Sequence, residues 1–312
     1  MPIKIPDNLP ANKILQSENV FVMNETRAVT QEIRPLKIMI VNLMPTKEVT
    51  ETQLLRLLSN TPLQMEVDLV TMASHESKHV SKKHLESFYY TFDDIQDRFY
   101  DGMIVTGAPV EKLEFEQVDY WKELVHVFNW AKEHVFSSFF ICWGAQAAMH
   151  YYYGIDKYLL KKKLTGVYKH HINAAKMKRR ILRGFDYQFY APHSRYTALL
   201  KEDISSIDSL DILAESDEAG VYLVASKDGS RFFVTGHSEY DADTLDKEYK
   251  RDIHDPDIIA EIPKNYYLDD DPSCEIQVKW RSHAYLLFAN WLNYYVYQET
   301  PFDLNELKNR NT

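Results

Sequence analysis

The chain has 312 residues, of which 45% are hydrophobic and 26% are charged, and this ordinary globular composition excludes a disordered or fibrous protein. The 36 basic and 46 acidic side chains leave a net charge of −10, which argues against a nucleic-acid binder because phosphate contacts need clustered lysine and arginine. No run approaches the roughly 20 apolar residues of a membrane-spanning helix. The only two cysteines, Cys142 and Cys274, make no disulfide framework, so we expect a cytoplasmic protein.

The first 35 residues are polar and include three prolines before Ile14, so they predict an arm that packs on a domain. Residues 36–300 contain no repeat and no linker-like composition, and we expect them to form one domain. Residues 301–312 follow as a C-terminal tail.

Short apolar runs alternate with amphipathic stretches through the first half of the chain. We predict strands at 36–43, 65–72, 102–107 and 138–142, and helices at 48–58, 118–135 and 145–153. This alternation implies an α/β fold with a mostly parallel, doubly wound sheet of flavodoxin-like type, flanked by helices on both faces. Ligands of such folds bind beyond the carboxyl ends of the strands.

The second half adds antiparallel character at the rim. Residues 220–225 and 231–235 flank the Asp228-Gly229 turn signal and predict a β-hairpin. Further helices are expected at 242–252 and 280–297.

Cys142 stands where a predicted strand ends and a predicted helix begins. A cysteine on such a sharp turn exposes its sulfur at the carboxyl edge of the sheet, and the helix N-terminus behind it favours the thiolate. The backbone N–H of Trp143 is then placed to donate into an oxyanion hole. These features predict a nucleophile, and the competing interpretation is a buried structural cysteine.

His237 follows the predicted strand at 231–235 and precedes Glu239 by two positions. In an extended segment such positions face the same way, so the carboxylate can orient the imidazole and stabilise its charged form. The predicted catalytic group is therefore a Cys142–His237–Glu239 triad. A histidine on a solvated loop beside an unrelated glutamate is the alternative interpretation.

Five segments resemble the homoserine O-acyltransferases of bacterial methionine biosynthesis, a family of the class I glutamine amidotransferase-like superfamily. They are NLMPTK at 42–47, VTGAP at 105–109, ICWGAQA at 141–147, PHSR at 192–195 and GHSEY at 236–240. The resemblance implies transfer of an acyl group from acyl-CoA to the γ-hydroxyl of L-homoserine, through a thioester on Cys142 and with His237 as the base. It also implies a homodimer, with no permanently bound cofactor and no metal.

The same resemblance implies substrate contacts by Lys163, Ser194 and Arg251, of which Arg251 suits the homoserine carboxylate as a bidentate partner. If the resemblance is set aside, an equally good interpretation is that Lys163 belongs to a solvent-exposed run of lysines. Lys47, which follows the first strand, is a further candidate for the oxyanion hole.

Glu111 indicates the acyl donor, because succinyl-using members of the family carry glycine there. A carboxylate at the edge of the acyl pocket would repel the terminal carboxylate of a succinyl group, at a cost of roughly 4 kcal/mol for charges about 4 Å apart. Acetyl-CoA is therefore the predicted co-substrate, with succinyl-CoA as the alternative. A surface glutamate after a loop proline is the competing interpretation.

Two other functions use parts of the same pattern. A glutamine amidotransferase would share the elbow and the His-x-Glu triplet, although such enzymes usually carry glycine where this chain has Phe140. A non-catalytic flavodoxin-like binding protein with a redox-reactive cysteine would have no use for His237 and Glu239.

Overall fold

The computed structural model describes residues 3–5, 22–24, 34–75, 80–256 and 258–309. Within the predicted N-terminal arm it describes two short strands, β1 (Ile3–Ile5) and β2 (Val22–Asn24), which pair in parallel as a sheet of their own. The rest of the arm up to residue 33 lies outside the described residues, and so does its predicted packing on the domain.

Ten strands of the described chain form one sheet, in the spatial order β5-β4-β3-β6-β7-β12-β11-β10-β8-β9. The strands are β3 (Leu36–Val41), β4 (Met65–Val70), β5 (Tyr89–Tyr90), β6 (Tyr100–Val105), β7 (Val135–Ile141), β8 (Lys157–Ile172), β9 (Gln188–Leu199), β10 (Leu210–Ser216), β11 (Gly220–Ser226) and β12 (Arg231–Val234). Neighbours from β5 to β12 run parallel, and neighbours from β12 to β9 run antiparallel. The parallel half confirms the predicted α/β architecture, and β11 and β12 form the predicted hairpin.

The helices lie between these strands in the sequence and at the rim. They are α3 (Lys47–Leu58), α4 (Lys82–Phe88), α5 (Phe92–Ile95), α6 (Trp121–His134), α7 (Trp143–Tyr153), α8 (Lys201–Ser205), α9 (Thr244–Asp252) and α10 (Arg281–Trp291). Short 3₁₀ turns occur at η1 (Phe115–Gln117), η2 (Ala174–Lys176), η3 (Arg180–Leu182), η4 (Leu268–Asp270) and η6 (Leu304–Asn309), and α10 continues as a π-helical turn, η5 (Leu292–Tyr297).

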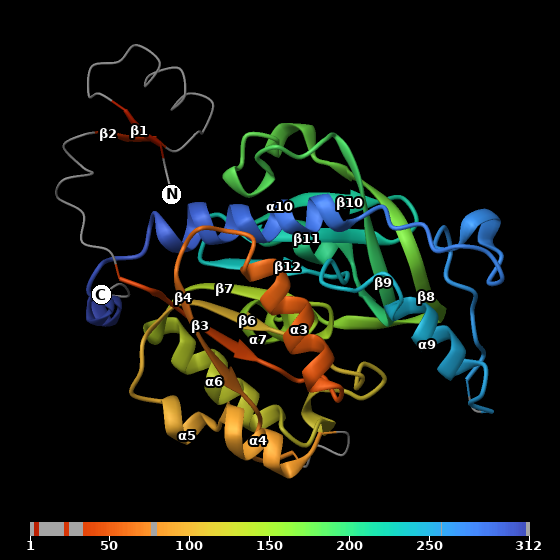
Figure 1. Cartoon of the computed structure of the whole chain (residues 1–312), viewed down its shortest axis with the longest axis horizontal. Coiled ribbons are helices and arrows are strands. Elements are labelled where there is room, and N and C mark those ends of the chain that lie inside the picture. The colour runs from red at the N-terminus through yellow and green to blue at the C-terminus, as the bar shows by residue number, and fades with distance from the viewer. Residues whose placement is uncertain (1–2, 6–21, 25–33, 76–79, 257, 310–312) are drawn as a thin grey trace.

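Helices cover both faces of the parallel half (Figure 1). Side chains of a strand point alternately to opposite faces, and β3 shows the consequence. Met39 and Val41 pack into the core that includes α6 and α7, whereas Ile38 and Ile40 pack into the core that includes α3 and α10. The apolar run at 36–43 is therefore continuous because both of its faces are buried.

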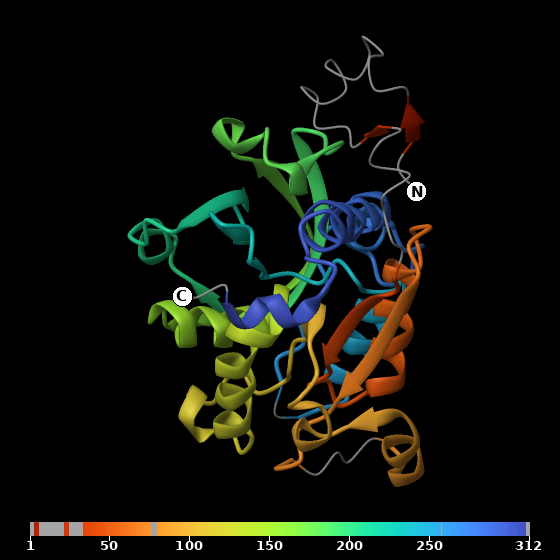
Figure 2. The ribbon, with the colours of Figure 1, turned by 90° about the vertical axis from the view of Figure 1, so that its left-hand side faces the viewer.

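The long antiparallel pair β8 and β9 is absent from the sequence prediction. Figure 2 shows these two strands, in green, at the opposite end of the sheet from the orange strands β3 and β4. The lysine run in β8 hides the strand, because Lys161 and Lys162 are exposed while Lys163 is buried. No simple alternation of apolar and polar residues marks this segment. The C-terminal tail carries η6, where Leu304 and Leu307 are buried.

Cys142 forms a tight elbow between β7 and α7. Its backbone has φ 48° and ψ −115°, a conformation that L-residues rarely adopt, and α7 begins at the next residue. The Cys142 amide donates to Val234 O at 2.7 Å, which ties the elbow to the end of β12. Such strain, of about 1–3 kcal/mol, persists only where surrounding structure enforces it, and it is typical of functional sites.

Gly144 permits the close approach that this elbow needs. A Cβ on Gly144 would lie 2.5 Å from Thr106 O and 3.0 Å from Val105 O, at the end of the neighbouring strand β6. Backbone oxygens cannot turn away as a flexible side chain can. The first turn of α7 can therefore pass β6 only if residue 144 has no side chain.

We predict that Gly144→Ala lowers the free energy of unfolding by about 3 kcal/mol or more, because it overpacks a rigid backbone contact. Gly154→Ala, at the other end of α7, is the matched control: its Cβ would meet nothing within 4 Å, and its positive φ costs about 1–2 kcal/mol. Urea unfolding of both variants measures the difference. Equal stability of the two variants would show that the contact with β6 does not constrain the elbow.

Candidate active site

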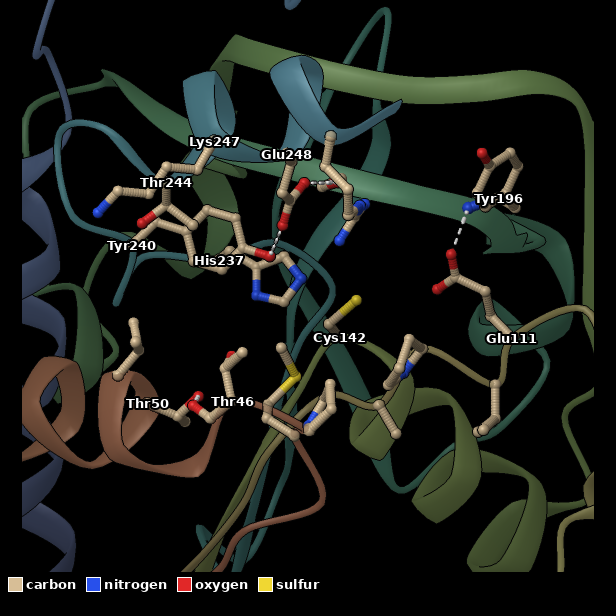
Figure 3. A pocket seen from close by; sticks show the side chains of 18 of the residues that line it. Thr46, Thr50, Glu111, Cys142, Tyr196, His237, Tyr240, Thr244, Lys247 and Glu248 are labelled. Carbon is tan, nitrogen blue, oxygen red and sulfur yellow. Dashed lines mark hydrogen bonds between the residues drawn. The ribbon is translucent and has the colours of Figure 1, made fainter. Parts of the chain in front are cut away.

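A pocket of about 610 Å³ lies beyond the carboxyl ends of parallel strands of the sheet (Figure 3). Its lining includes Cys142, directly after β7, and His237, shortly after β12. Residues 44–46 follow β3, and residues 108–113 follow β6. The fold therefore places the pocket where doubly wound sheets bind ligands. Its size is within the range of about 300–1,000 Å³ that is common for small-molecule sites.

Cys142 lines this pocket although only 3% of the residue is exposed. The interpretation as a sealed core cysteine is therefore not supported, since the side chain borders the cavity. Trp143 is the first residue of α7, and its side chain is fully buried. Its role as an oxyanion donor stays a prediction.

His237 lies beside Cys142, and the two side chains meet over Gly107. A Cβ on Gly107 would be 3.3 Å from both Cys142 Cβ and His237 Cε1, and a larger residue at position 107 would intrude between them. The ring of Tyr240 stacks on the imidazole with 4.2 Å between centroids. The His237 amide donates to Pro192 O at 2.8 Å, which anchors the loop after β12 to β9.

Glu239 completes the predicted triad. Its Oε1 lies 2.6 Å from His237 Nδ1, and both side chains are buried. Burial alone would lower the pKa of His237. The negative charges of Cys142 and Glu239, together with hydrogen bonds to both, overcome that effect and hold the pKa well above its usual value. The arrangement favours the charged form of His237 beside Cys142 and Glu239.

The three predicted substrate residues all line the pocket, and they are joined to each other by two carboxylates of α9. Lys163 Nζ lies 2.7 Å from Asp252 Oδ2, and Ser194 Oγ donates to Glu248 Oε2 at 2.5 Å. Arg251 donates to Asp252 Oδ1 from Nε and Nη2, at 2.9 and 2.7 Å. Lys163 is buried, so the interpretation of this lysine as part of a solvated run is wrong.

Glu248 is a pocket residue that the sequence analysis missed. It accepts hydrogen bonds from Ser194 and from the Tyr240 hydroxyl, at 2.8 Å for the latter, and Lys163 Nζ is 3.7 Å away. The signal was the helical spacing of Glu248, Arg251 and Asp252, which places them on one face. It could be recognised only by treating the charged helix α9 as part of the site.

Glu111 faces the pocket on the other side of Cys142 from α3 (Figure 3). Its Oε1 accepts a hydrogen bond from the Tyr196 amide at 3.0 Å. Burial raises the pKa of Glu111, while this hydrogen bond and the positive charges of His237, Lys163 and Arg195 oppose the rise. The interpretation as a surface glutamate is wrong, because Glu111 is half-buried, lines the pocket and accepts a hydrogen bond from the backbone of β9.

Lys47 is the predicted residue that the structure does not bring to Cys142. Its ammonium donates to Asn42 O and lies over the Tyr89 ring, 5.4 Å from the centroid. Burial lowers its pKa to about 8, with Glu51 opposing. The side chain is absent from the pocket lining among the described residues. The structure therefore does not support the prediction that this side chain contributes to an oxyanion hole.

In the described part of the chain, no group of three or more histidine, cysteine, aspartate or glutamate side chains is arranged to hold a metal ion. None of its helices combines the length and the apolar character needed to span a bilayer.

Comparisons with known proteins agree with the fold and with the sequence resemblance. A family model described as homoserine O-succinyltransferase (HTS) matches residues 2–302. A homoserine O-acetyltransferase from Catenibacterium mitsuokai is 75% identical over 310 residues, which is 99% of each chain. Another, from Acetivibrio thermocellus, is 56% identical and covers 99% of this chain and 100% of its own.

Solved structures support the fold alone. A glutamine amidotransferase from Thermotoga maritima matches with a TM-score of 0.55 at 12% identity, over 83% of this chain and 97% of its own. One from Methylobacillus flagellatus matches with a TM-score of 0.51 at 11% identity, over 84% and 95%. These neighbours confirm the predicted α/β fold with a mostly parallel sheet flanked by helices.

The raised pKa of His237 predicts a pH-dependent contribution to stability. A histidine whose pKa is raised by folding stabilises the fold fully below about pH 6.5, its unfolded value, and loses this contribution as pH rises through the folded value. The difference in free energy of unfolding between wild type and His237→Gln should therefore shrink as the pH increases above about 6.5. Urea unfolding at stepped pH measures it.

His170 supplies a control of opposite sign. Burial lowers its pKa to about 3, so wild type should lose stability relative to His170→Gln as pH falls below about 6.5. If the His237→Gln difference instead grew with rising pH, the charged imidazole would be excluded from the resting site.

Proposed function

The chain belongs to the homoserine O-succinyltransferase family. We propose that it is a homoserine O-acetyltransferase, because relatives that are 75% and 56% identical to it over nearly the whole chain bear that name. It transfers the acetyl group of acetyl-CoA to the γ-hydroxyl of L-homoserine and yields O-acetyl-L-homoserine for methionine biosynthesis. The observation that carries this proposal is the pocket itself, in which a Cys142–His237–Glu239 group faces a half-buried carboxylate, Glu111, and a set of paired charges from β8 and α9.

The first half-reaction loads the enzyme. The Cys142 thiolate attacks the carbonyl carbon of acetyl-CoA, and the bond between that carbon and the CoA sulfur breaks. His237, held charged by Cys142 and Glu239, gives its proton to the departing sulfur, so CoA leaves as a thiol. One thioester replaces another, and the step needs little driving force.

The second half-reaction uses the neutral imidazole left by the first. His237 takes the proton of the homoserine hydroxyl as the oxygen attacks the acetyl-thioester. The ester forms, the Cys142 thiolate is released, and His237 is again protonated. No proton is gained or lost over the full cycle, which agrees with a buried triad that exchanges protons only with its substrates.

The α9 side of the pocket fits the acceptor. In this proposal the exposed guanidinium of Arg251 binds the homoserine carboxylate, and Glu248 receives its ammonium beside the Ser194 hydroxyl. The ion pairs of Lys163 and Arg251 with Asp252 hold these groups in place before the substrate arrives. A fixed arrangement of this kind reduces the ordering cost of binding.

Neither alternative function, a glutamine amidotransferase or a non-catalytic binding protein, is favoured by an observation of its own. The solved glutamine amidotransferases share only the fold at this level of identity. A binding protein would not need a buried imidazole paired at 2.6 Å with a buried carboxylate. Cytoplasmic location, a homodimer and the lack of a resident cofactor remain proposals that rest on the cysteine usage and on the family.

Cys142 should carry the acetyl group. Intact-mass spectrometry after mixing with acetyl-CoA alone is expected to show one added acetyl group in wild type and none in Cys142→Ala. Steady-state transfer should fall by about 10³-fold or more in the variant, because the nucleophile and its partners act as a unit. Substantial transfer by a folded Cys142→Ala protein would exclude the covalent route.

Glu111 should select acetyl over succinyl. Repulsion of about 4 kcal/mol, at about 1.4 kcal/mol per tenfold, corresponds to several hundredfold in kcat/KM. Glu111→Gln removes the charge and keeps the size, whereas Glu111→Gly removes both. Both variants should gain succinyl transfer, and Glu111→Gly should gain more.

The raised pKa of Glu111 adds a pH test of the same residue. Protonation removes the repulsion, so the ratio of succinyl to acetyl transfer by wild type should rise as pH falls, and it should not do so in Glu111→Gln. An unchanged donor preference in both variants would remove Glu111 from the selection of the donor.

A further inference from the structure

The pocket extends on two sides of the catalytic pair. Figure 3 shows Cys142 and His237 between Glu111 and Tyr196 on one side and Thr46, Thr50, Thr244 and Lys247 on the other. The second side is a cleft between the N-terminal half of α3 and the start of α9. We call it the α3/α9 cleft, and its lining residues are Thr46, Val49, Thr50, Gln53, Asp241, Asp243, Thr244 and Lys247.

In the proposed function the acceptor does not occupy the α3/α9 cleft. Homoserine is a small zwitterion, and the charged groups that suit its ends, Glu248 and Arg251, belong to the last two turns of α9. Its hydroxyl needs only His237. The first turn of α9 and the N-terminal half of α3 therefore border pocket volume that the acceptor leaves empty.

The donor has the size and the chemistry to fill this volume. We propose that the pantetheine arm of the acyl-CoA lies in the α3/α9 cleft, with Lys247 at the rim beside the phosphates of the donor. The inference rests on the proposed function and assigns the donor a binding site of its own, separate from the groups that bind homoserine.

The deep part of the cleft is neutral and polar, as a pantetheine chain requires. Thr50 and Gln53 are buried, and Gln53 Nε2 donates to Thr244 Oγ1 at 3.0 Å, which links α3 to α9. Pantetheine carries amides and a hydroxyl between short apolar stretches and has no charge near its thiol end. Hydroxyl and amide side chains satisfy such a chain without the desolvation cost that charged groups would add.

The rim of the cleft is apolar on α3, and at the start of α9 it carries Lys247 together with Asp241 and Asp243. Val49 is 47% exposed although it lines the pocket. Lys247 is 69% exposed and pairs with Asp243 at 2.8 Å. An exposed pair of this kind is worth less than about 1 kcal/mol, so Lys247 is free to turn toward an incoming phosphate.

The reaction geometry also favours separate parts of the pocket for the donor and for the acceptor. The CoA sulfur that accepts a proton from His237 and the homoserine oxygen that gives one must each occupy the same place beside the imidazole. From that place one direction leads to the paired charges of α9, which do not match pantetheine. A second direction leads to Glu111 and Tyr196, which in the proposed function border the acyl group, and the α3/α9 cleft is the remaining direction that the pocket provides among the described residues.

The first test fills the cleft. Val49→Trp should raise the KM for acetyl-CoA about tenfold and leave the KM for homoserine within about twofold. Leu55→Trp is the matched control, because Leu55 is 40% exposed on the same helix and does not line the pocket. It should change neither KM.

The second test isolates the phosphates. Lys247→Ala should raise the KM for acetyl-CoA about two- to fivefold, the range of an exposed ion pair, and should have no effect on S-acetylpantetheine, which carries no phosphate. Lys250→Ala is the matched control. Lys250 forms the same type of pair, with Asp246 at 2.8 Å and 66% exposure, but lies outside the pocket lining.

The outcomes separate this inference from the proposed function. If Val49→Trp and Lys247→Ala behave like their controls while wild type transfers acetyl groups, the donor lies elsewhere and the inference is overturned. If wild type transfers acetyl from neither donor, the proposed function fails. A rise in the KM for homoserine in Val49→Trp would instead assign the cleft to the acceptor.

Discussion

The rest of the site depends on the backbone turn at Cys142. A positive φ at this residue turns the chain from β7 into α7 within a single position, and only then does the sulfur reach the pocket at the edge of the sheet. The turn is enforced from three directions: by the bond to Val234 O on β12, by the close pass of Gly144 over β6, and by Gly107 beside Cys142 Cβ. Strain at one residue is thus maintained by contacts with two neighbouring strands.

Burial strengthens the electrostatic interactions among the charged groups of this pocket, and pairing reduces the free-energy cost of burying them. An isolated buried ion is costly, whereas a buried ion with well-placed partners is not. His237 lies between Cys142 and Glu239, and Lys163 between Glu248 and Asp252. Glu111 differs, because its direct contact is a backbone N–H and its balancing charges are not in contact with it. Burial therefore raises its pKa.

The sequence predicted those parts of the structure that local pattern controls. Strands buried on both faces, such as residues 36–41, stand out as apolar runs, and residues at their carboxyl ends, such as Cys142, are brought together by the topology. The pair β8 and β9 was missed because a lysine run conceals which residue faces inward. Glu248 was missed because its role arises from tertiary contacts with Ser194 and Tyr240. Lys47 was misplaced because chain proximity to β3 does not fix the direction of a long side chain, which here donates to Asn42 O and lies over the Tyr89 ring.

The elbow alone does not decide what the enzyme makes. In the proposed mechanism a thioester on Cys142 reacts with whichever nucleophile His237 deprotonates, and water is always the most abundant one. Selection of an alcohol must therefore come from groups that hold it at the imidazole for longer than water remains there. The groups proposed for this role come from β8, β9 and α9, which lie outside the parallel half that forms the elbow. The proposed nucleophile and the proposed acceptor site are thus built by different parts of the chain, so the same parallel core is compatible with different acceptors.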